Sequence, residues 1–240
     1  MIDEPSPERS YRGGIEPAGL TCYSVVIGES DLYICTEKDS SAEAQESLGR
    51  HRTELEEYLA RHLSFGTSFK PVPMASEAPG IVAAMAEAAE SCDVGPMASV
   101  AGAIAQSVGS DLLAVSARVI VENGGDLFLA GGGPTKVRIF AGAGSPPVDI
   151  LVEDAPEGVG LCTSSATVGP SVSLGATDAV TVLARTATLA DAAATAIGNT
   201  VFSPEDIGAG LKRASSLPGV SGAVIMLQGS MGAWGKLEIA

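Results

Sequence analysis

The sequence is poor in aromatic and basic side chains, and it contains no long apolar run. Aromatic residues make up only 4% of the 240 residues, so a core must be built from Ala, Val, Leu and Ile. Lys and Arg number 14 against 29 Asp and Glu, and the net charge of -15 leaves no basic face to displace counterions from nucleic acid. No segment reaches the roughly 18 apolar residues of a membrane-spanning helix. The composition argues against nucleic-acid and membrane partners, and it leaves a small-molecule ligand or a second copy of the chain.

Neither the cysteines nor the start of the chain carries a sorting or metal signal. No two cysteines have Cys-x-x-Cys spacing, which excludes a zinc ribbon and a thioredoxin-type motif; the four are Cys22, Cys35, Cys92 and Cys162. A core of this size needs no disulfide, so we expect reduced thiols. The opening "MIDEPSPERSYRGG" is acidic and Pro-rich and lacks the features of a signal peptide. We therefore expect a cytoplasmic protein with a loose segment over 1–20 and a single domain over 21–240.

The first half of the chain predicts one hairpin followed by helices. Two β-rich runs around Gly28 predict a hairpin over 21–36. Ser40 and Glu43 have capping-box spacing, and the apolar spacing after them predicts an amphipathic helix up to Gly66. Alanine-rich helices are expected at "GIVAAMAEAAESC" and at "GPMASVAGAIAQSVG", the second with Pro96 in its first turn.

The second half predicts an antiparallel sheet. Five short β-rich runs follow one another from Leu113 to Ser165 without an intervening helix. A strand at "DAVTVLA", a helix at "TLADAAATAIGN", a helix from Ser203 and a terminal hairpin complete the chain. The fold class is therefore α+β, with antiparallel sheets packed against helices. An alanine-rich helix precedes a hairpin in both halves, which leaves an internal duplication open.

The segment "VENGGDLFLAGGG" groups polar and glycine residues between apolar runs. A dinucleotide-binding loop requires a helix after the glycines, but "LFLAG" is another strand, so the Rossmann interpretation fails. Asn-Gly between apolar runs instead predicts a hairpin turn. The candidate ligand-binding residues at this turn are Glu122, Asn123, Gly124, Gly125 and Asp126.

Two further segments offer candidate site residues. Asp191 and Thr195 are four residues apart on one helical face, and both carry hard oxygen donors suited to Mg²⁺. The alternative is that Asp191, together with Thr188, caps its own helix. The hydroxyl-rich run at Thr163, Ser164, Ser165 and Thr167 either lies in an anion-binding loop or ends a strand. The only histidines, His51 and His62, are expected at the surface or partly buried with satisfied hydrogen bonds, rather than in a metal or base site.

These motifs carry a resemblance to known families. "VENGGDLFLAG" and "TLADAAATAIGN" resemble the Asn-x-Gly-Gly-Asp and Ala-Asp-Ala-x-Ala-Thr-Ala motifs of the ApbE flavin transferases, which move FMN from FAD onto a threonine of a target protein. "GPMASVAGAIAQSVG", "CTSSATVGPS" and "TDAVTVLARTATLADAAATAIGN" resemble the UPF0280 (DUF375-type) proteins, which are distant relatives of that family.

The resemblance implies a fold, a cofactor and a metal site. The fold would be ApbE-like, related to the tetrahydrobiopterin-synthesis fold, and FAD or FMN would be the cofactor. Asp191 and Thr195 match the positions that hold Mg²⁺ in the transferases. The transferases also carry a His-Ile-x-Asp-Pro-x-Thr-Gly segment, and "LCTSSATVGPS" replaces it here without histidine or aspartate. We therefore hypothesise a nucleotide-binding cleft without flavin transfer onto protein; the alternative is a noncatalytic metabolite-binding or oligomeric scaffold.

Overall fold

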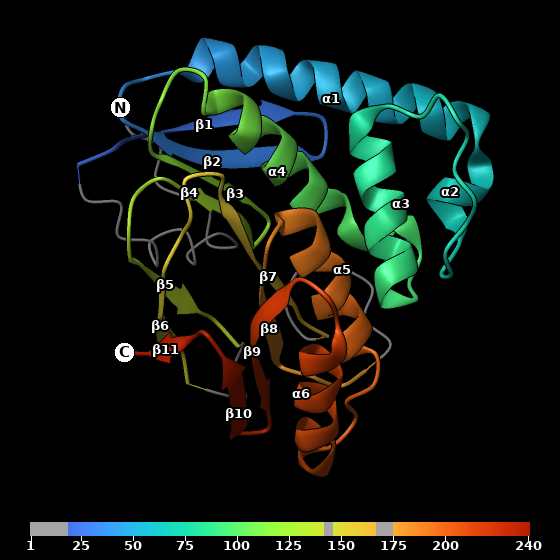
Figure 1. The fold of residues 1–240 in the computed structure, drawn as a ribbon, viewed down its shortest axis with the longest axis vertical. Helices are drawn as coiled ribbons and strands as arrows, with labels where there is room; N and C mark the ends of the chain where they lie inside the picture. Colours follow the sequence, from blue (N-terminus) through green and yellow to red (C-terminus); the bar gives the residue numbers. More distant parts are fainter. Residues whose placement is uncertain (1–18, 142–145, 167–174) are drawn as a thin grey trace.

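The computed structural model describes residues 19–141, 146–166 and 175–240. An eight-stranded antiparallel sheet crosses the molecule in the order β1-β2-β3-β4-β7-β8-β9-β10, and a three-stranded sheet has the order β11-β6-β5 (Figure 1). The strands are β1 (Thr21–Ile27), β2 (Ser30–Thr36), β3 (Val119–Asn123), β4 (Asp126–Ala130), β5 (Thr135–Ile139), β6 (Val148–Val152), β7 (Val159–Ser164), β8 (Ala179–Ala184), β9 (Val220–Leu227), β10 (Ser230–Gly235) and β11 (Glu238–Ile239). The helices are α1 (Ser41–Arg61), α2 (Leu63–Thr67), α3 (Gly80–Cys92), α4 (Val100–Leu112), α5 (Ala187–Gly198) and α6 (Ile207–Ser216), with short 3-10 helices η2 (Pro96–Ser99) and η4 (Pro204–Asp206).

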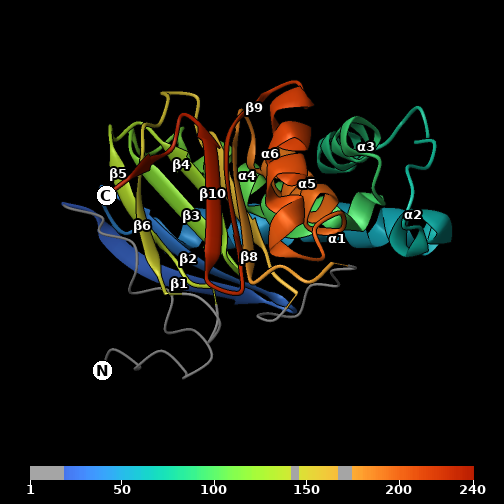
Figure 2. The same cartoon turned by 90° about the horizontal axis from the view of Figure 1, so that it is seen from below.

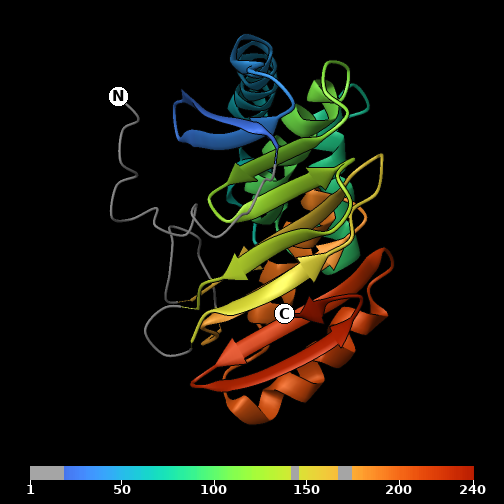
Figure 3. The ribbon, with the colours of Figure 1, turned by 90° about the vertical axis from the view of Figure 1, so that its left-hand side faces the viewer.

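The elements form three layers, with helices on one face of the large sheet and the small sheet on the other (Figures 2 and 3). Successive side chains of each central strand point alternately toward the helices and toward the small sheet. In β3, Val119 and Val121 pack in the core beneath the helices, whereas Ile120 packs in a second core beneath the small sheet. The large sheet is therefore buried on both faces at its centre. This arrangement is the α+β fold that the sequence predicts.

Helix α5 lies at the centre of the helical layer and contacts β7, β8, α3 and α4. Its side chains are mostly alanine, and Ala192, Ala193 and Ala194 are fully buried. A Cβ at Gly160 of β7 would lie 2.2 Å from the Cα of Ala187, so the strand and the helix are in backbone contact there. Close approach through small residues is how this protein fills its core with few aromatic side chains.

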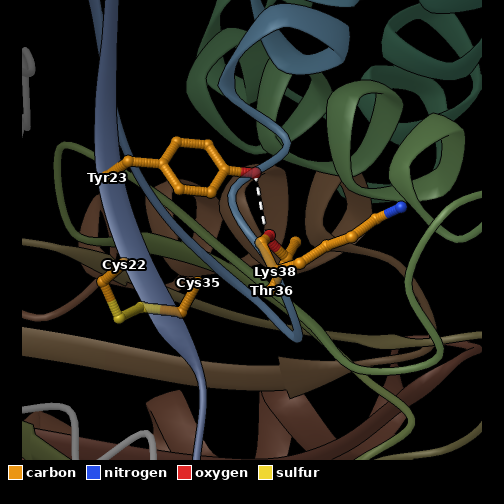
Figure 4. The surroundings of a disulfide bond; sticks show 5 residues. All are labelled: Cys22, Tyr23, Cys35, Thr36 and Lys38. Carbon is orange, nitrogen blue, oxygen red and sulfur yellow. Dashed lines mark hydrogen bonds between the residues drawn. A yellow bond between two sulfur atoms is a disulfide. The ribbon is translucent and has the colours of Figure 1, made fainter.

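The predicted hairpin over 21–36 is confirmed, but the prediction of four reduced cysteines is wrong. Cys22 and Cys35 lie opposite each other in the antiparallel register of β1 and β2 and form a disulfide (Figure 4). Next to this pair, the Thr36 hydroxyl donates to the Tyr23 hydroxyl at 3.1 Å. Cys92 and Cys162 are free thiols and are buried. The physical reason for the correction is the register, which places both sulfur atoms on the same face of the hairpin.

Two predicted helix starts and one helix end also need correction. Ser40 precedes α1, but its hydroxyl donates to the Lys38 carbonyl at 3.4 Å instead of capping the helix. The helix ends at Arg61 rather than at Gly66, because the chain turns at His62 and buries Phe65 in the separate helix α2. The cap of α5 is Thr186, whose hydroxyl accepts the Leu189 N–H at 3.2 Å. The predicted cap Thr188 therefore lies inside the helix.

The remaining elements largely follow the predictions. The two alanine-rich helices appear as α3 and as η2 with α4, and Pro96 occupies the first turn of η2. The terminal hairpin is β9 with β10, but the last residues leave it to form β11 beside β6. Within the described parts of the chain, no helix is both long and apolar enough to cross a membrane.

Candidate functional site

The segment "VENGGDLFLAGGG" contains a tight turn followed by a backbone anion site that the chain itself fills. Asn123 and Asp126 pair across the β3–β4 hairpin, and Gly124 and Gly125 make the turn with φ values of +65° and +102°. Both glycines are needed there because L side chains rarely adopt positive φ. At the end of β4, the N–H groups of Gly132 and Gly133 donate to the carboxylate of Asp154 at 3.0 and 3.1 Å. The last glycines therefore cradle an anion, and that anion is an aspartate of the same chain.

Two side chains from distant elements meet on the first turn of α4. The Asn123 amide donates to the Ala101 carbonyl at 3.1 Å, and the Gly102 N–H donates to Asp191 Oδ2 at 2.9 Å. Gly102 permits this contact, since a Cβ there would lie 2.3 Å from the Ala187 carbonyl oxygen. Asp191 is thus placed at the positive end of the α4 dipole. The idea that Asp191 caps its own helix is therefore wrong; it caps a different helix.

Three carboxylates lie close together beneath this turn. Glu122 accepts the Gly125 N–H at 2.8 Å, and Asp126 accepts the Thr163 N–H at 3.2 Å; the residues are 2% and 6% exposed. Burial raises the pKa of Asp126 well above its ordinary value, and the nearby charge of Asp191 raises it further. Burial also raises the pKa of Asp191 to about 7, although the backbone N–H groups of the α4 turn oppose the shift. Ionisation of both carboxylates at once is therefore disfavoured in this pair.

The hydroxyl-rich run lies mostly in a strand. Thr163 and Ser164 are the last residues of β7, and Ser165 follows directly. The Thr163 hydroxyl hydrogen-bonds the Thr181 hydroxyl of β8 at 2.9 Å, and Ser164 and Ser165 are buried. Thr167 lies outside the described residues. The strand-end interpretation therefore describes this run better than the loop interpretation.

Two cavities flank the beginning of α4. The larger has a volume of ≈ 640 Å³ and lies between α1, α4 and the turns β1–β2 and β3–β4; Asn123 and Gly124 form part of its wall. The smaller has a volume of ≈ 230 Å³ and lies between α5, η2 and the segment after α2; Thr195 and Asn199 form part of its wall. Small-molecule sites commonly measure about 300 to 1,000 Å³, so the larger cavity alone is of the right size for a ligand.

The structure therefore brings together some of the predicted site residues and separates others. Asn123 and Gly124 reach the larger cavity, Thr195 reaches the smaller one, and Asp191 contacts the α4 turn beside the larger cavity. The hydroxyl-rich run lines neither cavity. Among the residues that the structure describes, no group of three or more His, Cys, Asp or Glu side chains is placed to hold a metal ion.

Several residues that shape the larger cavity carry no recognisable pattern in the sequence. Arg52 of α1 lies at its rim, where it binds the Ser30 hydroxyl at 2.8 Å and the carboxylates of Glu29 and Glu56 at 2.7 and 2.6 Å. Arg52 and the turn of the β1–β2 hairpin are 22 residues apart, so no local pattern connects them. The two histidines line neither of these cavities: His51 contacts Asp111 at 2.9 Å, and His62 stacks on Tyr58.

Comparisons with known proteins agree with this architecture. A family model described as "AbpE bacteria" matches residues 16–232. A UPF0280 protein of Methanococcus maripaludis is 40% identical over 81% of this chain and 81% of its own length, and a UPF0280 protein of Methanocaldococcus jannaschii is 38% identical over 89% and 90%. The flavin transferase ApbE from Vibrio cholerae superposes with a TM-score of 0.60 at 13% identity, covering 92% of this chain and 98% of its own. The flavinyl transferase ApbE of Pseudomonas stutzeri gives 0.58 at 14% identity, covering 90% and 94%.

Proposed function

Because this chain belongs to the UPF0280 family and has the fold of the ApbE flavin transferases, we propose that it binds a flavin nucleotide together with Mg²⁺ at the start of α4. The observation that carries the proposal is the convergence of Asn123 and Asp191 on the first turn of α4, beside a cavity of ≈ 640 Å³. The walls of this cavity include Leu55, Leu59 and Ile104, which suit an aromatic ring system.

Two carboxylates at this turn would hold Mg²⁺, which proteins usually bind through one or two carboxylates, with water and phosphate oxygens as the other ligands. Asp126 and Asp191 are close enough for the charge of one to raise the pKa of the other, and both are carboxylates of the kind that Mg²⁺ prefers. Asp191 is the residue that would hold the ion, with Thr195 one turn further along the same helix. A bound Mg²⁺ would neutralise the charge of a nucleotide's phosphate groups. The role of this chain's residues would be to hold the carboxylate in place, through the N–H groups of the α4 turn.

Flavin transfer onto protein is not part of the proposal. Neither cavity is lined by a histidine, and the two histidines are engaged by Asp111 and Tyr58. The ionisable groups lining the larger cavity are Glu29, Asp31, Glu56 and Arg52. Because no histidine lines either of these cavities, we restrict the proposal to binding of the nucleotide and do not extend it to transfer.

The test is ligand-dependent stabilisation of the purified protein. At about 100 times Kd a ligand stabilises by roughly 2.7 kcal/mol, so the Tm of a chain of this size should rise by roughly 5 to 10 °C. FAD, FMN and ATP are each added with Mg²⁺ or with EDTA, and the absorption spectrum of freshly purified protein is recorded for bound flavin. Asp191→Asn and Thr195→Val should remove the Mg²⁺-dependent part of the shift. Asp149→Asn, on the small sheet, is the matched control and should keep it. Absence of a shift with all three nucleotides would reject the proposal.

One observation favours a second candidate, a noncatalytic scaffold. The Asp191 carboxylate already accepts the Gly102 N–H, as a structural cap does. A purely structural Asp191 predicts that Asp191→Ala costs about 0.5 to 2 kcal/mol whether or not a nucleotide is present. Unfolding of wild type and Asp191→Ala is measured with and without FAD and Mg²⁺. If Asp191 holds the ion, the stability lost in the variant is larger when the ligands are present; if it is only a cap, the loss is the same in both conditions.

A further inference from the structure

The first residue of α5, Ala187, is held on several sides by α4 and β7. Its N–H donates to the side-chain oxygen of Gln106 at 2.8 Å, and its carbonyl accepts the Cys162 thiol at 3.2 Å. A Cβ at Gly160 would lie 2.2 Å from its Cα, and a Cβ at Gly102 would lie 2.3 Å from its carbonyl oxygen. Because both glycines let the neighbouring elements contact the backbone of Ala187 directly, the start of α5 has no room to shift toward α4 or β7.

This anchored residue lies one helical turn before Asp191. Residues i and i+4 share one face of a helix, and here both residues face Gly102 of α4. A Cβ at Gly102 would lie 2.3 Å from the carbonyl oxygen of Ala187 and 2.8 Å from the Cβ of Asp191. Since the backbone hydrogen bonds of a helix fix one turn relative to the next, the position of Ala187 determines where the Asp191 carboxylate lies.

The helices α4 and α5 cap each other. The Asp191 carboxylate of α5 accepts the Gly102 N–H of α4 at 2.9 Å, and the Gln106 oxygen of α4 accepts the Ala187 N–H of α5 at 2.8 Å. The N–H groups in the first turn of a helix have no partner within that helix, so each helix supplies an acceptor that the other one lacks. Two hydrogen bonds, one turn apart on each helix, therefore fix the orientation of α5 relative to α4. Gln106 does this without adding a negative charge beside Asp191.

We propose that Gln106 is a positioning residue for the Mg²⁺ site: by holding Ala187, it fixes the Asp191 carboxylate at the first turn of α4, where the ion would bind. Gln106 lines neither of the two cavities described above, so its effect would reach the ligands through Asp191. Residues that orient a metal ligand commonly change metal affinity by roughly 10- to 100-fold when they are replaced. The inference rests on the proposed function and adds to it a residue that would not touch the ion.

The experiment measures the Mg²⁺ affinity of the full chain, by titrating Mg²⁺ at saturating FAD and following the Tm. Gln106→Met keeps the length of the side chain but removes its oxygen, and it should weaken Mg²⁺ binding by roughly 10-fold or more. Gln106→Glu keeps an acceptor oxygen and should bind Mg²⁺ within about 3-fold of the wild type. Thr186→Ala is the matched control, because it removes the cap that α5 makes with its own chain. It should lower the Tm in EDTA about as much as Gln106→Met does, while changing the Mg²⁺ affinity by less than about 3-fold.

The outcomes separate the positioning role from the binding function. If Mg²⁺ does not change the Tm of the wild type at saturating FAD, the Mg²⁺ site of the proposed function fails and the positioning role fails with it. If the wild type binds Mg²⁺ and Gln106→Met binds it equally well, only the positioning role is overturned. Equal losses of Mg²⁺ affinity in Gln106→Met and Thr186→Ala would mean that Gln106 acts only through the stability of α5, which also overturns the role. Should Gln106→Met not fold, a loss of roughly 10-fold in Gln106→Glu would reject the role of the side-chain oxygen.

Discussion

Replacing Asp191 by Asn should make the protein more stable than the wild type at high pH, because a buried carboxylate with a raised pKa destabilises the folded state when it ionises. The folded pKa is about 7, against about 3.9 in an unfolded chain. Below the lower value both states hold the proton. As the pH rises toward 7 the unfolded chain releases it while the folded chain keeps it, so stability falls until the pH passes the folded pKa.

The size of the effect follows from the pKa values. From pH 5 to the folded pKa of about 7, only the unfolded state is deprotonated, and the free energy of unfolding falls by about 1.36 kcal/mol per pH unit. Between pH 5 and pH 8 the wild type should therefore lose about 3 kcal/mol of stability relative to Asp191→Asn. Sharing of the proton with Asp126 spreads the loss over a wider pH range. The Asn amide oxygen can still accept the Gly102 N–H, so the α4 turn stays capped.

The assay is urea unfolding followed by circular dichroism at pH 5, 6, 7 and 8, in EDTA so that no cation compensates the charge. Asp149→Asn is the control: Arg138 beside Asp149 holds the pKa of that carboxyl well below its usual value, so its effect should not change over this pH range. Curves of Asp191→Asn and wild type that run parallel from pH 5 to pH 8 would refute the reasoning.

Three further changes test the packing and the local caps. Gly109→Ala would place a Cβ 2.1 Å from Phe128 Cδ1 in the core and should cost about 1 to 3 kcal/mol in urea unfolding. Reduction of the Cys22–Cys35 disulfide should lower stability by about 3 kcal/mol, as expected for closing a loop with a sequence separation of 13, which unfolding with and without reductant measures. Thr186→Ala removes the cap of α5 and should cost about 1 kcal/mol by thermal unfolding.

Each of these changes has a control within the chain. Gly80→Ala has open space around its Cβ and should leave stability unchanged or raise it slightly, so an equal loss at Gly80 and Gly109 would contradict the packing argument. Reductant should leave a Cys22→Ser, Cys35→Ser double variant unaffected. Thr53→Ala, exposed in the middle of α1, should change stability less than Thr186→Ala; the reverse order would argue against the cap.

The sequence was informative where structure depends on neighbouring residues. The hairpins at Gly28 and at Asn123 carry their own turn residues, and the alanine-rich helices carry their own apolar spacing. The disulfide could have been predicted as well. A two-residue turn at Gly28-Glu29 pairs residues symmetrically about itself, and this symmetry puts Cys22 opposite Cys35.

The candidate site depended on contacts that no local pattern contains. Asp191 caps a helix that begins about 90 residues earlier, since its partner Gly102 is separated from it by 89 positions. The sequence around a carboxylate near the start of a helix is the same whether the carboxylate caps that helix or a different one. Likewise, the larger cavity is lined by Arg52 of α1 together with residues of the β1–β2 and β3–β4 turns, which lie far apart in the sequence. Only the packed structure decides such cases.

The meeting of Asn123 and Asp191 on one helical turn also bears on the order in which the protein folds. The turn belongs to residues that leave the ribosome long before α5 does, so the site cannot close until the chain has been made to about residue 200. Such distant contacts form slowly, because much chain entropy must be lost before they form. A ligand that binds at this turn would therefore recognise only chains in which both the β3–β4 hairpin and α5 have packed against α4.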